Sequence, residues 1–94
     1  MKTRQELIEF RDVLTSEFQS VGVVCKWMCE TGKVIVQRNG TKKLTFSLRD
    51  ERTYKDDVIK MRTILDTKLD GYKLTYSNQL GSSRPEYKVI VTLK

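Results

Sequence analysis

Apolar residues recur at helical spacing near the start of the chain, at Leu7, Phe10, Leu14 and Phe18. Thr3 and Glu6 precede this stripe with the Thr-x-x-Glu spacing of a capping box, and Gly22 follows it as a stop signal. The pattern predicts an amphipathic helix over residues 4–20.

A second stripe at helical spacing lies in the middle of the chain and consists of Tyr54, Val58, Met61, Leu65 and Leu69. Thr53 with Asp56 forms a second capping pair before it, and Asp50 is an alternative cap. Asp70-Gly71 ends the stripe. We therefore expect a second amphipathic helix along it.

Between these helices the apolar and polar residues alternate, as in strands with one buried side. From Val21 onward, the alternation points four residues inward, namely Val23, Cys25, Trp27 and Cys29. Thr31-Gly32 indicates a tight turn into a second strand that runs from Lys33 to Arg38.

A third strand follows the second, and it points Leu44, Phe46 and Leu48 inward. A two-residue turn at Asn39-Gly40 would set the inward Val36 opposite Lys43. A three-residue loop over residues 39–41, or a bulge, instead aligns Val36 with Leu44 and keeps the inner side apolar. We predict the three-residue loop.

Two further alternating stretches follow the second helix. Tyr72, Leu74 and Tyr76 point inward along a fourth strand, and Tyr87, Val89, Val91 and Leu93 along a fifth. The element order is therefore α-β-β-β-α-β-β. It predicts an α+β two-layer sandwich in which two helices cover one face of a five-stranded, largely antiparallel sheet. With 94 residues, we expect a single compact domain over residues 1–94.

The same alternation assigns a row of basic side chains to the other, outward face of the sheet: Lys26, Lys33, Lys43, Lys73, Lys88 and Lys94. The net charge differs between the predicted strands and the predicted helices. Residues 21–48 and 72–94 sum to +7, whereas the predicted helical parts sum to −1, so the strands carry the formal net charge of +6. A lysine-rich face of this kind attracts phosphates independently of sequence.

The composition offers few residues that could act in catalysis. The chain has no histidine, its five glycines are isolated, and its two cysteines have no histidine partner. We therefore expect no enzyme activity, no cofactor and no metal site. The cysteines favour a reducing compartment. No apolar run approaches the length of a membrane span and the first residues lack the apolar core of a signal peptide, so we expect a cytoplasmic protein without a membrane partner.

These observations favour a protein that binds a nucleic-acid duplex, most simply DNA, through Lys26, Lys33, Lys43, Lys73 and Lys88. Arg38 and Arg84 would contact the duplex from two hairpin tips beside the sheet. Because the aromatic residues of the strands are predicted to point inward, the outer face would offer no platform on which unpaired bases could stack.

Two other interpretations of the outer face remain open. Met28, Ile35 and Ile90 are its apolar members, and ringed by lysine they would suit an acidic protein partner. Alternatively, the lysines only keep the sheet soluble and prevent edge-to-edge pairing.

The order of the elements is similar to that of two known architectures. The first five elements resemble the αβββα order of double-stranded RNA-binding domains, although the second helix opens with RDERTYKDD rather than with a lysine cluster. The complete order is similar to the double-wing DNA-binding domain of a bacteriophage transcription activator. That resemblance implies duplex contact through the sheet face and its hairpin wings.

Overall fold

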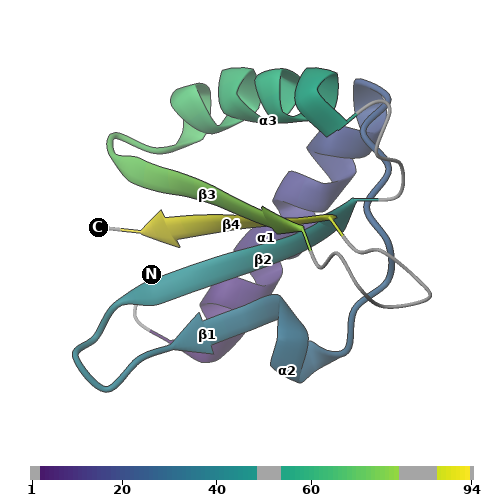
Figure 1. Ribbon diagram of the computed structural model, residues 1–94. Helices are drawn as coiled ribbons and strands as arrows, with labels where there is room; N and C mark the ends of the chain where they lie inside the picture. The colour runs from purple at the N-terminus through teal and green to yellow at the C-terminus, as the bar shows by residue number, and fades with distance from the viewer. Residues whose placement is uncertain (1–2, 49–53, 79–86, 94) are drawn as a thin grey trace.

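The computed structural model describes residues 3–48, 54–78 and 87–93 of the chain. Two long helices and a short helical turn accompany four strands in these ranges (Figure 1). In chain order the elements are α1 (Arg4–Ser20), α2 (Glu30–Lys33), β1 (Val34–Val36), β2 (Lys42–Leu48), α3 (Tyr54–Lys68), β3 (Tyr72–Asn78) and β4 (Tyr87–Leu93).

Helix α1 begins and ends where the sequence predicts. The Glu6 backbone N–H donates a hydrogen bond of 3.1 Å to Thr3 Oγ1, which caps the first turn. At the other end, Gly22 takes a positive φ of 91°, and the N–H groups of Gly22 and Val23 donate to the carbonyls of Gln19 and Phe18. This is the pattern of a Schellman motif, which satisfies the last carbonyls of the helix.

The two long helices share one hydrophobic core with the sheet. Leu7, Leu14 and Phe18 of α1 and Met61 and Leu65 of α3 are fully buried. They join one cluster with the inward residues of the strands, which include Leu44, Phe46, Leu48, Val89 and Val91. Both long helices therefore cover the same face, as predicted. In Figure 1, α1 passes behind the sheet and α3 lies above it.

The sheet has the strand order β1-β2-β4-β3, and each neighbouring pair is antiparallel. The last strand in the chain thus lies in the interior of the sheet, between β2 and β3. The α+β class and the antiparallel pairing agree with the sequence analysis. No helix in the described ranges combines the length and the apolar character needed to cross a membrane.

The prediction of five strands is wrong, because the described residues form a four-stranded sheet. Residues 21–30 do not make a strand: the part before α2 contributes one isolated bridge, between Cys25 and Leu48. The turn predicted at Thr31-Gly32 is instead the helical turn α2. The α-β-β-β-α-β-β order, on which both architectural resemblances depend, is therefore not the observed order.

The loop between β1 and β2 has the predicted length but a shifted position. The Gln37 N–H donates to the Thr41 carbonyl at 2.8 Å, so the loop comprises residues 38–40. Its last residue, Gly40, has a φ of 87°. Val34 consequently pairs with Leu44, where the sequence analysis paired Val36 with Leu44. The shift spans two residues, so Val34 still points inward and is buried.

Candidate nucleic-acid interface

We call the sheet face that points away from α1 and α3 the outer face. Its side chains form rows across the strands, because residues paired in register point to the same side. The first row consists of Ile35, Lys43, Thr92 and Lys73. The next row consists of Thr45, Ile90 and Thr75, and the third contains Ser47 and Lys88. No described residue in these rows is acidic.

The chain between the Cys25–Leu48 bridge and β1 leaves the edge of the sheet and folds against the outer face. We call residues 26–33 the edge insertion. The Lys26 N–H still donates to the Ser47 carbonyl at 2.7 Å. A hollow of about 300 Å³ is lined by Ser47 and Lys88 of the outer face and by five residues of the insertion, namely Lys26, Trp27, Met28, Cys29 and Gly32. We call this hollow the Trp27 hollow.

Trp27 lies at the surface with 85% of its area exposed, although the sequence analysis placed it inside. That prediction is wrong because the edge insertion does not continue the strand, so the alternation of inner and outer residues stops at the bridge. Cys29, also predicted inward, is exposed for the same reason. An aromatic side chain therefore lies beside the outer face, in a hollow that Lys26 and Lys88 also line.

The predicted phosphate-binding residues do not all gather on this surface. Lys26, Lys43, Lys73 and Lys88 belong to the outer face or to the Trp27 hollow. Lys33 instead turns toward α1, and its Nζ lies 3.4 Å from Oδ1 of Asp12 on that helix. The same Nζ lies 3.5 Å from Oε1 of Glu30, at the start of α2. Arg38 is exposed in the loop after β1. Arg84 and Lys94 lie outside the described residues.

The three residues predicted to contact a protein partner are separated. Ile35 is exposed on the edge strand β1, and Ile90 is half-buried on β4, with β2 between these strands. Met28 is half-buried in the edge insertion and lines the Trp27 hollow. They do not form a continuous apolar patch.

Arg11 contacts the edge of β2 beside the insertion from the helix layer, a role that was not predicted from the sequence. Carbonyls two residues apart on a strand point the same way, so the Thr45 carbonyl points to the same edge of β2 as the Ser47 carbonyl that Lys26 bonds. Arg11 Nε donates to that Thr45 oxygen at 3.3 Å, at the gap that the insertion leaves in the ladder. The guanidinium also lies over the Phe46 ring, 4.9 Å from its centroid.

The two cysteines beside the insertion have different electrostatic environments. Burial raises the pKa of the Cys25 thiol to about 11, despite the nearby charge of Arg11. The pKa of Cys29 is lowered, chiefly because its sulfur is hydrogen-bonded to the Thr31 hydroxyl at 3.2 Å. Both thiols are free. The described ranges hold no group of three or more residues that could ligate a metal ion.

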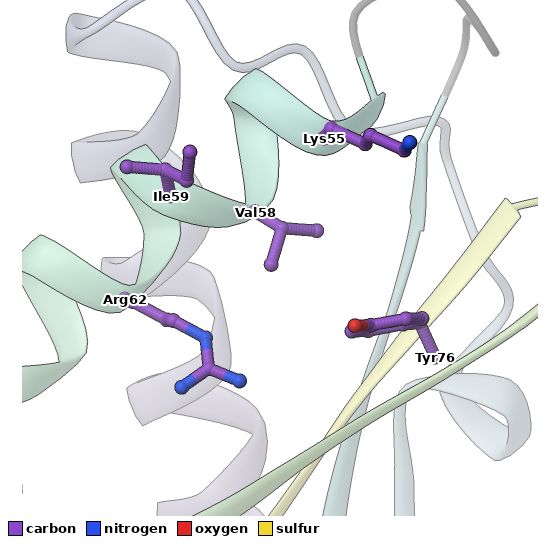
Figure 2. A pocket seen from close by; sticks show the side chains of 5 residues that line it. All are labelled: Lys55, Val58, Ile59, Arg62 and Tyr76. Carbon is purple, nitrogen blue, oxygen red and sulfur yellow. The ribbon is translucent and has the colours of Figure 1, made fainter.

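A second hollow, of about 310 Å³, lies in the helix layer between α3 and β3. Figure 2 shows Val58 and Arg62 extending from α3 toward the ring of Tyr76, with Lys55 and Ile59 on the same helix. Tyr76 has the inward parity of β3 but is 56% exposed here. Lys55 and Arg62 thus lie away from the outer face. Substituting them changes the net charge of the protein without changing the lysines of the outer face.

In comparisons with protein-family models, with curated proteins and with solved structures, the chain has no significant match.

Proposed function

We propose that the protein is a non-enzymatic nucleic-acid-binding protein and that the outer face binds the phosphate backbone. The observation that supports this proposal most directly is the set of rows that carry Lys43, Lys73 and Lys88, with Lys26 at the edge and no acid among the described residues of the rows. Lysines that neutralise phosphates release the counterions condensed on the nucleic acid. Arg38, exposed beside the first row, would extend the contact.

The preference for a duplex rested on the expectation that no aromatic residue faces outward. Trp27 removes that reason, so the proposal covers nucleic acid in general. As part of the same proposal we place the protein in the cytoplasm, where two free thiols would stay reduced. An acidic protein as the partner stays a prediction, and Ile35→Ser is the variant that would weaken a protein complex without weakening phosphate contacts.

The salt dependence of binding tests the proposal. Four phosphate contacts on B-DNA predict a log–log slope of about −3.6, which corresponds to roughly a 150-fold loss of affinity between about 50 and 200 mM salt. The measurement is fluorescence anisotropy of a labelled DNA duplex and a labelled single strand of the same sequence. Absence of binding at low salt, or an affinity that salt does not change, would refute the proposal.

A matched pair of double variants separates the outer face from net charge. Lys43→Glu with Lys73→Glu removes two contacts and should weaken binding by roughly 60-fold or more at about 0.1 M salt. Lys55→Glu with Arg62→Glu changes the net charge equally but lies in the helix layer. We expect this control to bind within about threefold of the wild type, because screening over a Debye length of about 10 Å isolates the two layers. Equal losses in both variants would contradict a binding face.

A further inference from the structure

The Trp27 hollow combines three features that single-strand-binding surfaces share. Its lining includes the exposed indole of Trp27, it also includes Lys26 and Lys88, and it adjoins sheet rows that hold no acid among the described residues. Proteins that bind unpaired nucleic acid place successive bases on aromatic rings beside a basic track for the backbone. An exposed tryptophan with no basic neighbours would carry no such implication.

Size limits what the hollow can hold. Its volume of about 300 Å³ lies at the lower end of the range for small-molecule pockets. It therefore suits one planar group, and its lining offers that group the Trp27 indole and the polarisable Met28 side chain. Base pairs within an intact duplex are stacked on their neighbours and expose only their edges, so their faces cannot reach an indole.

We propose that the Trp27 hollow holds one unpaired base stacked on the indole, while Lys26 and Lys88 contact the phosphates on either side of it. This inference rests on the proposed function and narrows its ligand. The protein then binds strands with unpaired nucleotides more tightly than a fully paired duplex. The remaining lysines of the outer face, Lys43 and Lys73, contact the backbone further along.

The single tryptophan makes the stacking step directly observable. The wild-type protein is titrated with oligothymidylate, with a strand of the same length whose residues are abasic, and with a fully paired duplex. Each titration is followed both by anisotropy of a label on the nucleic acid and by intrinsic fluorescence. We expect strong quenching of Trp27 with oligothymidylate and little with the abasic strand or the duplex, even where anisotropy reports binding.

Two variants complete the experiment. Trp27→Ala should weaken the binding of oligothymidylate by about 5- to 150-fold, the factor that one stacked base contributes, and should leave the abasic strand within about twofold of the wild type. Trp27→Phe keeps an aromatic ring and should retain most of the affinity. Because Trp27 is 85% exposed, both variants should keep the wild-type circular dichroism spectrum.

The outcomes distinguish the two proposals. If no nucleic acid binds at low salt, the proposed function fails and the stacking site fails with it. If oligothymidylate binds without quenching, or binds Trp27→Ala as tightly as the wild type, the base-stacking inference alone is overturned. Equal affinity for the abasic strand and for oligothymidylate would overturn it in the same way.

Discussion

Arg11 is buried at the edge of β2 with only 3% of its surface exposed, an unusual position for a guanidinium. Burial lowers its pKa, although Cys25, Asp12 and Glu30 act in the opposite direction. The hydrogen bond to the Thr45 carbonyl supplies the donor that a continuous edge strand would have supplied. Arg11 Nη2 is buried without a hydrogen-bond partner among the described residues, so the arrangement stabilises the edge at a cost.

Replacing Arg11 by Met tests which of these effects dominates. The apolar stem is kept, but the Thr45 carbonyl loses its donor, and we expect a loss of about 1 to 2 kcal/mol in the free energy of unfolding. The measurement is urea denaturation. Arg4→Met is the matched control, since Arg4 also donates to a backbone carbonyl, that of Glu30 at 3.2 Å, but at an exposed site. It should cost less than about 0.5 kcal/mol.

A variant Arg11→Met as stable as the wild type would mean that the desolvation of the charge cancels the hydrogen bond, as happens at some buried ionic sites. The sequence contained a signal for this burial, because Arg11 lies four residues after Leu7 and three before Leu14, on the same helical stripe. What no pattern could show is the backbone oxygen that Arg11 meets, since Thr45 lies 34 residues away in another element.

At the scale of elements, the helices and the last strands were predictable because each depends on local signals. Helix α1 has a capping residue, a periodic stripe and a terminal glycine, and the observed bounds, Arg4–Ser20, match the predicted ones. The strands β3 and β4 contain the predicted alternating residues. For these elements the local pattern and the tertiary packing point to the same structure.

The edge insertion was not predictable from the same signals. Val23, Cys25, Trp27 and Cys29 alternate with polar residues as a strand would. The helical turn α2 that follows carries an i,i+3 ion pair between Glu30 and Lys33, and Lys33 also reaches Asp12 on α1. An alternating pattern shows which side chains are apolar, but it does not show at which residue the backbone stops pairing with the neighbouring strand. The sequence therefore predicted the strand lysines of the candidate site but not the exposed position of Trp27.

The end of α1 offers a test of the conformation that Gly22 allows. Gly22→Ala places a Cβ at a φ of 91°, where it meets only Lys60 Nζ at 3.9 Å, so the cost is conformational and we expect a loss of about 1 to 2 kcal/mol. Gly22→Asn should lose less, since asparagine visits this region more readily. Both are measured by thermal and urea unfolding.

Gly32 in α2 is the control for that prediction. Its φ is not positive, and an added Cβ would lie 3.2 Å from the flexible Met28 Cε, so Gly32→Ala should change stability by less than about 0.5 kcal/mol. A Gly22→Ala variant as stable as the wild type would contradict the prediction. It would mean that the last turn of α1 can lose its Schellman hydrogen bonds without a cost in the free energy of unfolding.

Across the whole molecule, charge is divided between two layers. The helix layer pairs its charges locally, as Lys68 and Glu17 do across α3 and α1 at 2.9 Å. The rows of the outer face carry Lys43 and Lys73 in the first row and Lys88 in the third, and none of the described residues in these rows is acidic. Like charges on one face repel each other and destabilise the folded state slightly. A polyanion that neutralises them would relieve that repulsion only in the native structure, because the rows do not exist in the unfolded chain.

Binding to the outer face should therefore be visible as stability. A ligand that binds only the native state, at a free concentration of 100 times its Kd, raises the free energy of unfolding by about 2.7 kcal/mol. For a domain of this size that corresponds to an increase in Tm of roughly 10 to 20 °C. Thermal unfolding with and without single-stranded DNA measures it. The increase should disappear in about 1 M salt, where the Debye length is near 3 Å.

The two double variants show whether this stabilisation depends on the outer face. At the same DNA concentration, the variant with Lys43→Glu and Lys73→Glu should show little increase in Tm, and the variant with Lys55→Glu and Arg62→Glu should keep the increase. An equal response of the two variants would show that DNA is attracted by net charge and not by the rows of lysine on the sheet.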